Sequence, residues 1–292
     1  MMVAMKRISK RMRLLIIIIS IIIFIASAVV AWGCIENKML KITRYTIKSS
    51  RVPNSFVGYK IAQISDLHNT EIGKDNEKTL SLLKSADPDI IVLTGDLIDS
   101  RKTKIDVAID FAKKANEIAP CYYVSGNHES RLADFNGFAS KLEAVGVTVL
   151  KNQKVRLLDG EEYITLIGIE DPAFTNEYPS GKDDEYIEQT LGGLTAEDDG
   201  FTVVLSHRPE LLSSYSKCGA DLVFSGHAHG GQFRIPFVGG VYAPGQGFFP
   251  KYTQGVVVEG NTNLVISRGV GNSAFPFRLN NRPEIVLVTL EN

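Results

Sequence analysis

The histidines of this chain occupy positions at which imidazole could bind a metal ion. All five lie in short motifs at the ends of apolar runs, and they are His68, His128, His207, His227 and His229. An acidic motif, Gly95-Asp96-Leu97-Ile98-Asp99, lies between the first two of them. Imidazole and carboxylate are ligands that borderline divalent metals prefer. The residue types therefore predict metal chemistry at a site assembled from several motifs.

Each motif follows a stretch that the apolar pattern predicts to be a strand. The predicted strands are 59–64, 89–94, 121–124, 201–205 and 221–224. A candidate ligand follows each strand within three residues, and these ligands are Asp66, Asp96, Asn127, His207 and His227. Helical patterns at 74–85 and 104–118 separate the first strands, which is typical of an α/β protein. Ligands bind at the carboxyl ends of strands in such sheets, so we expect the motifs to converge.

Composition narrows the classes of function that the chain can have. Its 292 residues are long enough for one large domain with a buried core. The net charge is -1 and the pI is about 6.5, so no overall field attracts nucleic acid and we expect no nucleic-acid binding. Three cysteines are too few for a disulfide framework, and their spacing excludes a cysteine-type zinc knuckle.

The N-terminal region predicts a membrane anchor. Residues 1–13 carry five basic and no acidic side chains, and residues 14–33 carry no charge. Twenty helical residues span roughly 30 Å, which matches the hydrocarbon core of a bilayer. There are two alternatives to an uncleaved anchor. A signal peptidase could cleave the chain near Ala26-Ser27-Ala28, or the chain could be cleaved at a lipoprotein box that ends at Cys34.

The basic residues also predict the orientation of the chain. Their excess before the span favours a cytoplasmic N-terminus at 1–13, with a signal-anchor helix at 14–33. Residues 34–55 would form a linker with a possible first strand, and 56–292 would form the catalytic domain. We therefore expect a single-pass protein of the cell membrane whose catalytic domain lies on the outer face.

Taken together, the motifs resemble those of the calcineurin-like metallophosphoesterases. Asp-x-His, Gly-Asp-x-x-Asp, Gly-Asn-His-Glu, a lone His after a strand and Gly-His-x-His occur in the order of that family, over roughly residues 56–292. The segment 230–272 resembles the YkuE/YaeI-like bacterial phosphodiesterase subgroup. The resemblance implies a four-layer α/β/β/α sandwich, here preceded by one transmembrane helix.

The resemblance also implies two divalent metal ions that share one bridging carboxylate. One ion would take Asp66, His68, Asp96 and His229. The other would take Asp96, Asn127, His207 and His227. No ligand position is missing from the chain. The ligand types do not choose among manganese, iron, zinc and magnesium.

Catalytic and substrate-binding roles follow from the same resemblance. His128 would stabilise or protonate the leaving oxygen, with Asp99 as a carboxylate that orients it and favours its charged form. Asp99 could instead cap a helix, since a helical stretch follows it. Arg131 and Arg208 could hold substrate phosphate through bidentate hydrogen bonds, or could serve structural roles.

These expectations add up to a membrane-anchored dinuclear phosphoesterase. It would hydrolyse a phosphodiester or pyrophosphate by attack of metal-bound hydroxide, on a substrate associated with the envelope or with lipid. A broad phosphomonoesterase is the runner-up, and an inactive binding module of the same fold is the alternative outside the enzymes. The aromatic segment 233–252 either contacts the membrane or packs as an ordinary hairpin.

Overall fold

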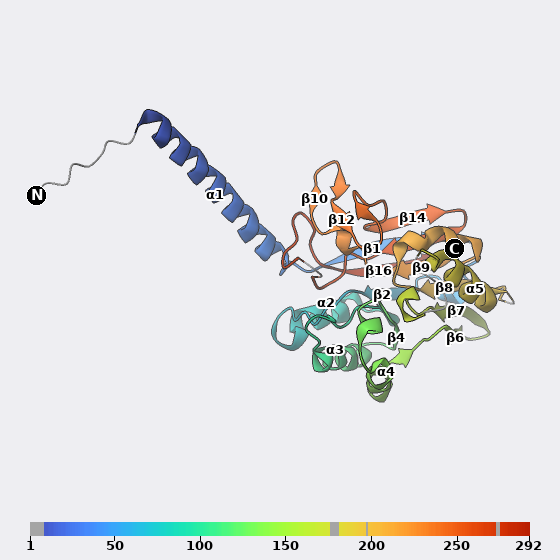
Figure 1. Ribbon diagram of the computed structural model, residues 1–292. Coiled ribbons are helices and arrows are strands. Elements are labelled where there is room, and N and C mark those ends of the chain that lie inside the picture. The colour runs from blue at the N-terminus through green and yellow to red at the C-terminus, as the bar shows by residue number, and fades with distance from the viewer. Residues whose placement is uncertain (1–8, 176–180, 197, 273–274) are drawn as a thin grey trace, which may run out of the picture.

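Two six-stranded β-sheets form the centre of the protein (Figure 1). The computed structural model describes residues 9–175, 181–196, 198–272 and 275–292. The first sheet has the order β1-β16-β2-β3-β4-β5. Its strands are β1 (Lys41–Lys48), β16 (Glu284–Glu291), β2 (Lys60–Ile64), β3 (Ile90–Thr94), β4 (Cys121–Val124) and β5 (Thr148–Val149). Strands β2 to β5 are parallel, while β16 runs parallel to β1 and antiparallel to β2.

The second sheet has the order β14-β15-β9-β8-β7-β6. Its strands are β14 (Gly255–Glu259), β15 (Thr262–Ile266), β9 (Leu222–Ser225), β8 (Phe201–Leu205), β7 (Glu162–Gly168) and β6 (Gln153–Asp159). The four central strands are parallel, and an antiparallel strand closes each edge. The parallel strands of both sheets read as continuous apolar runs because both faces of each sheet are covered.

Helices cover the outer face of each sheet and complete four layers. The helices α2 (Glu77–Ala86), α3 (Ile105–Asn116) and α4 (Phe135–Ala144) share one buried cluster with alternate residues of β2 and β3. The helices α5 (Asp183–Thr195) and α6 (Leu212–Lys217) share another with β8 and β9. The remaining strand residues, such as Val92, Val203 and Phe224, pack between the sheets. The expected α/β/β/α sandwich is therefore confirmed.

The helix predicted at 74–85 begins three residues later in the structure, at Glu77. Residues Lys74–Asn76 form a separate 3₁₀ turn in which Asp75 and Asn76 have positive φ values of 50° and 61°. Residues with left-handed backbone conformation cannot form part of a right-handed α-helix. The periodicity of apolar residues in the sequence does not show which residues adopt that conformation. The turn thus separates the loop after Asp66 from the helix that follows it.

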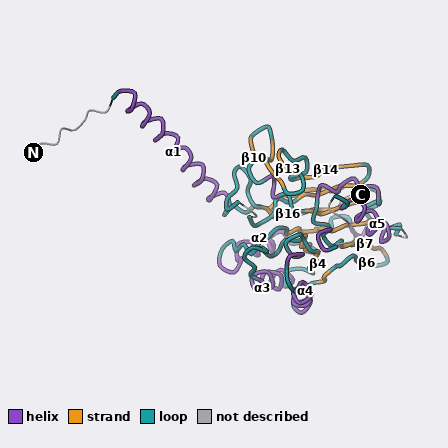
Figure 2. The backbone as a smooth tube through the Cα atoms, viewed as in Figure 1, coloured by secondary structure: helices purple, strands orange, loops and turns teal. Residues whose placement is uncertain are grey.

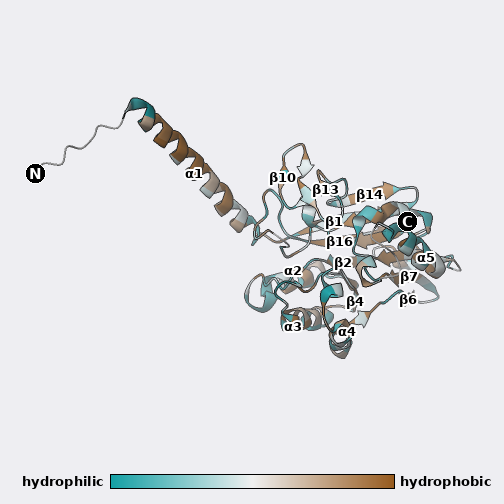
Figure 3. Ribbon diagram, in the orientation of Figure 1, coloured by the Kyte–Doolittle hydropathy of each residue, from teal (hydrophilic) through white to brown (hydrophobic). Residues whose placement is uncertain are grey.

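The long N-terminal helix α1 (Lys10–Glu36) projects away from the sandwich (Figure 1). Its surface is almost entirely apolar (Figure 3), and Ser9 caps it by accepting a hydrogen bond from the N–H of Met12. It is the one helix among the described residues that is long and apolar enough to cross a membrane. Two of the five basic residues before the span, Lys6 and Arg7, lie outside the described residues.

Short strands form two small hairpins between β9 and β14 (Figure 2). The first joins β10 (Arg234–Ile235) to β11 (Gly239–Gly240). The second joins β12 (Tyr242–Ala243) to β13 (Gly247–Phe248). The aromatic segment expected at 233–252 therefore consists of hairpins and loops rather than of long strands.

Candidate metal centre

The seven predicted metal ligands follow the carboxyl ends of five parallel strands, and the structure brings six of them, all but Asn127, into groups that could hold a metal ion. Asp66 and His68 follow β2, Asp96 follows β3, and Asn127 follows β4. His207 follows β8, and His227 and His229 follow β9 in the other sheet. Both sheets therefore contribute to one cluster, because their carboxyl ends face the same edge of the sandwich.

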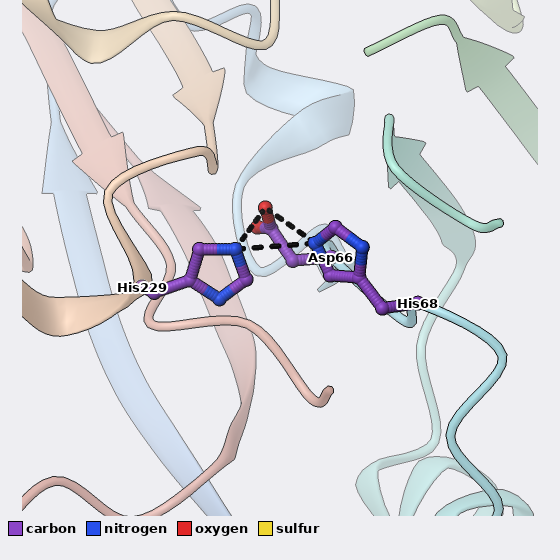
Figure 4. Close-up of side chains that lie close together, drawn as sticks. All are labelled: Asp66, His68 and His229. Atoms are coloured by element: carbon purple, nitrogen blue, oxygen red, sulfur yellow. Dashed lines mark hydrogen bonds and ion pairs between the residues drawn. The ribbon is translucent and has the colours of Figure 1, made fainter. Parts of the chain in front are cut away.

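One group of candidate ligands consists of Asp66, His68 and His229 (Figure 4). The Nε2 atoms of the two histidines lie 3.1 Å apart, and Asp66 Oδ1 lies 3.3 Å from His229 Nε2. All three side chains are buried. Two imidazole nitrogens and a carboxylate oxygen that converge from different loops form a donor set that suits a divalent cation.

A second group consists of Asp96, His207 and His227. Asp96 Oδ2 lies 3.3 Å from His207 Nε2 and 3.5 Å from His68 Nε2. Its other carboxylate oxygen accepts a hydrogen bond of 2.8 Å from the backbone N–H of His128. Asp96 therefore stands between the two groups, as a carboxylate that bridges two cations must.

Three buried polar atoms of the predicted ligands lack hydrogen-bond partners among the described residues. They are His68 Nδ1, Asn127 Oδ1 and His207 Nε2. His207 Nδ1 lies 2.7 Å from the carbonyl oxygen of Thr94 and donates to it, which turns Nε2 towards Asp96. Unpaired buried polar atoms are costly, and a bound cation would satisfy Asn127 Oδ1 and a deprotonated His207 Nε2. The residues present thus fit a metal centre.

The protonation states of the histidines also suit metal binding. Burial lowers the pKa of His68 to about 4 and that of His227 to about 3, so both rings are neutral and carry a free lone pair. Burial disfavours the charged form of His207 as well, but the carboxylate of Asp96 outweighs it and raises the pKa to about 10. A cation that binds between His207 and Asp96 must displace this proton.

The backbone of the ligand loops is strained. Five ligands have φ values between 46° and 64°, and they are Asp66, His68, Asp96, His227 and His229. L-residues rarely adopt this left-handed conformation, and each such residue costs about 1–3 kcal/mol. Strain of this kind clusters at functional sites. It shows that the surrounding strands hold the ligands in place at the expense of local backbone energy.

Two glycines give the ligand loops the room they need. A Cβ atom on Gly126 would collide with Asp96 Oδ1, and one on Gly226 would collide with Asp66 Oδ2. Both approaches are far closer than van der Waals contact, so each position excludes any side chain. These glycines let the backbone approach the two carboxylates closely.

Glu129 is a site residue that sequence reasoning did not single out. Its fully buried carboxylate accepts hydrogen bonds from the backbone N–H groups of Asp96, Ile98 and Gly126, at 2.9, 3.2 and 2.8 Å. It therefore joins the loop after β3 to the loop after β4. The position next to His128 in the Gly-Asn-His-Glu motif was the available signal, but three backbone partners cannot be read from sequence.

His128 lies at the edge of the ligand cluster, with its ring 4.6 Å from that of His68. Its Nδ1 accepts a hydrogen bond of 3.1 Å from the backbone N–H of Ser100. In the neutral ring the proton therefore resides on Nε2, which makes that nitrogen a hydrogen-bond donor. His128 also forms a third group of possible metal ligands with His68 and Asp96. Burial lowers the pKa of His128, although Asp96 and Asp99 oppose this shift.

Asp99 lies beside His128, but its hydrogen bonds are made to Arg101. Its Oδ1 lies 3.6 Å from His128 Nδ1, and its carboxylate forms a bidentate pair with Arg101 at 2.9 and 3.0 Å. It also accepts from the backbone N–H of Arg101, whereas α3 begins only at Ile105. Asp99 therefore shapes the turn that presents Ser100 to His128, and it does not cap α3.

The two candidate arginines have different environments. The guanidinium of Arg208 binds both carboxylate oxygens of the buried Asp171, at 2.8 and 2.9 Å, and also contacts Asp183 at 3.1 Å. Arg131 is exposed, and no hydrogen bond or ion pair joins its guanidinium to another described residue. Arg208 is thus held in ion pairs within the protein, whereas the guanidinium of Arg131 faces solvent.

Comparison with known proteins finds metallophosphoesterases that are similar in sequence to this chain. The calcineurin-like phosphoesterase family matches residues 59–231. The uncharacterised metallophosphoesterase YkuE of Bacillus subtilis (strain 168) is 32% identical over 264 residues, 88% of this chain and 88% of that protein. Phosphodiesterase YaeI of Escherichia coli (strain K12) is 28% identical over 247 residues, 80% of this chain and 82% of that protein.

A solved structure shares the fold. The protein TT1561 of Thermus thermophilus superimposes with a TM-score of 0.51 and 16% identity, covering 73% of this chain and 90% of that chain. At this identity the likeness concerns the fold alone. Together, these similarities confirm the family resemblance that the motifs predicted.

Glu129→Ala is expected to destabilise the protein and weaken metal binding. The substitution leaves three buried N–H groups without acceptors, at about 1–3 kcal/mol for each group. Bound metal per chain and the denaturant midpoint of unfolding measure the two effects. Glu143→Ala, at an exposed position on α4, is the matched control. Wild-type metal content together with a wild-type midpoint in Glu129→Ala would show that Glu129 does not join these loops.

Proposed function

This chain belongs to the calcineurin-like phosphoesterase family of metal-dependent phosphohydrolases, and we propose that it hydrolyses a phosphodiester or pyrophosphate. The observation that carries the proposal is the convergence of donor side chains from both sheets around Asp96. The name of the relative YaeI, a phosphodiesterase, supports the diester class.

The seven ligands divide into two sets in this proposal. Asp66, His68, Asp96 and His229 hold one divalent cation. Asp96, Asn127, His207 and His227 hold the other. When bound, the two cations supply positive charge that lowers the pKa of a water molecule and neutralises the oxygens of the phosphate.

In this proposal His128 and Arg131 act directly on the substrate, and Asp99 is a positioning residue. Ser100 donates to Nδ1 of the neutral ring of His128, so Nε2 carries the proton and would donate a hydrogen bond to the leaving oxygen. Transfer of a proton to that oxygen would start from the charged ring, which Asp96 and Asp99 favour, and would leave the ring neutral. Asp99, with Arg101, holds the turn that positions Ser100. Arg131 binds a non-bridging phosphate oxygen, since its guanidinium has no partner among the described residues.

The N-terminal region gives the enzyme its location in this proposal. Residues 1–13 lie in the cytoplasm, residues 14–33 within α1 span the cell membrane, and the catalytic part lies on the outer face. Residues 34–55 connect the two and contribute β1 to the first sheet of the catalytic domain 56–292. The substrate would therefore be a phosphoester of the envelope or of a lipid.

The chain loaded with manganese is expected to hydrolyse bis-p-nitrophenyl phosphate faster than p-nitrophenyl phosphate. Asp96→Asn should abolish turnover of both and lower bound metal, because it removes the charged bridge that the two sites share. Asp110→Asn, on the surface of α3, is the matched control. A preference for the monoester would favour a broad phosphomonoesterase. Bound metal without turnover of any phosphoester would favour an inactive binding module.

His128→Ala is expected to slow turnover by roughly 10²–10⁴-fold while metal content stays near wild type. The loss should shrink as the leaving group improves, because nitrophenolate departs without protonation whereas an alkoxide does not. Rates across a leaving-group series, together with elemental analysis, provide the measurement. Loss of metal, or an equal loss for every leaving group, would contradict the role of His128.

Protease added to intact protoplasts is expected to degrade the region from Lys38 to Asn292 and to spare a tag at the N-terminus. The basic flank retains the N-terminus inside, so the catalytic part is exported. Immunoblots against the tag and against the catalytic part measure the two regions. Protection of the catalytic part until lysis would reverse the proposed orientation.

A further inference from the structure

We propose that an aromatic surface beside α1 inserts into the interface of the bilayer that α1 spans. The aromatic surface lies on the two small hairpins and comprises Ile235, Phe237, Val238, Tyr242, Phe248 and Phe249. The inference rests on the proposed anchoring by α1 and assigns a second, independent contact with lipid. It concerns how the catalytic part is oriented, and it does not depend on which phosphoester is hydrolysed.

The exposure of the aromatic surface is unusual for a soluble face. Phe237 is 109% exposed, Phe248 is 74% exposed and Phe249 is 65% exposed. The rings of Tyr242 and Phe248 lie 5.4 Å apart, so the second hairpin presents a contiguous patch. Exposed apolar patches of this kind mark sites of interaction with a partner or a membrane.

The backbone conformation of two of these residues is not explained by packing of their side chains within the protein. Phe237 and Phe249 have φ values of 67° and 54°, which bulky L-residues rarely adopt. Each costs about 1–3 kcal/mol in the folded chain. Neither side chain recovers this energy by burial within the protein. Contact with an apolar phase outside the protein would recover it.

The end of α1 is docked on the segment 276–282. Gly33 lies so close to this segment that a Cβ atom there would meet Arg278 O at 2.6 Å. The side chain of Asn37 donates to Pro276 O at 2.9 Å and accepts from the backbone N–H of Arg278 at 3.0 Å. These contacts fix the direction in which α1 leaves the catalytic part, and so they fix the plane of the bilayer.

The same segment holds the hairpins that carry the aromatic surface. The N–H of Arg234 donates to Leu279 O at 2.9 Å, and Asn280 Nδ2 donates to Arg234 O at 3.2 Å. Gln232 Nε2 also donates to Phe277 O at 2.9 Å. The hairpins and the end of α1 therefore share one support, on the side of the sandwich from which α1 projects (Figures 1 and 3).

The charge of this region fits a lipid surface better than a second protein copy. From Gly230 to Val258 the chain has no acidic residue, and its basic residues are Arg234 and Lys251. Anionic headgroups would therefore meet no like charge. Aromatic side chains beside basic ones are typical of surfaces that lie in the membrane interface.

The segment 276–282 also contacts the metal centre. Asn281 Nδ2 donates to the backbone oxygen of His229 at 2.7 Å, and Arg278 Nη2 lies 3.5 Å from His229 Nδ1. Insertion of the aromatic surface would thus hold the metal centre at the level of the headgroups. A phosphoester carried by an amphiphile would reach it without leaving the interface.

The test uses the full chain in vesicles of phosphatidylcholine and phosphatidylglycerol with shallow-brominated acyl chains. Trp32 on α1 is the only native tryptophan, so Trp32→Phe gives a silent background. Phe237→Trp places a reporter in the aromatic surface. Leu158→Trp, on β6 and 73% exposed, is the matched control outside it. We expect quenching and a blue shift for the reporter at position 237, and neither for the control.

Separate outcomes distinguish the inference from the proposed anchoring. Quenching of native Trp32 without quenching at position 237 would overturn the inference and leave the anchor intact. Absence of quenching at both positions would overturn the anchoring as well. A blue shift at position 237 without quenching, in a chain of dimeric mass, would assign the surface to a second copy and overturn the inference. Activity is not needed for any of these measurements.

Discussion

Two ionised carboxylates buried side by side are the constraint on which this structure depends. Burial and the neighbouring charge of Asp96 raise the pKa of Asp66 to about 6, although His207 opposes the shift. Charges in such a place persist only when donors or cations surround them. The surrounding groups are imidazoles, backbone N–H groups and the proposed metal ions. The buried strands, the left-handed ligand residues and the glycine contacts all serve to bring these partners within reach of the two carboxylates.

The sandwich supplies the stiffness that this arrangement requires. The apolar layer between the sheets packs Val92 and Val124 of the first sheet against Val203 and Phe224 of the second. Protein interiors are packed as densely as organic crystals, so one sheet cannot slide past the other without opening voids. Ligands from the two sheets therefore keep their distances. The strained backbone of the loops is the local energetic cost of that precision.

Much of the fold and of the candidate site follows from the sequence, because apolar runs define the strands and a polar ligand ends each one. The convergence of the ligand-bearing loops was predictable on that basis. The resemblance of the motifs to the family predicted the four-layer architecture. The three backbone partners of Glu129, the ion pair of Arg208 with Asp171 and the pairing of Asp99 with Arg101 were not predictable. Each of these interactions depends on which side chains and loops contact one another in the folded protein, and a single sequence does not indicate those contacts. The late start of α2 was hidden for a related reason, since left-handed residues can sit inside a helical pattern of apolar positions.

The strand order of the first sheet has a consequence for how the protein is made. The final strand β16 lies between β1 and β2, and Thr43 on β1 contacts Glu284 on β16 across 241 positions of the chain. A chain synthesised from its N-terminus therefore exposes the edges of β1 and β2 until residues 284–291 emerge. Closing so long a loop is slow, because its entropy is lost before the pairing is gained. If the chain is exported, the first sheet cannot close until residues 284–291 have been translocated, while a helix held in the bilayer keeps the unfinished chain at the membrane. The unpaired edges during this interval make the nascent chain a client for chaperones on the side where it folds.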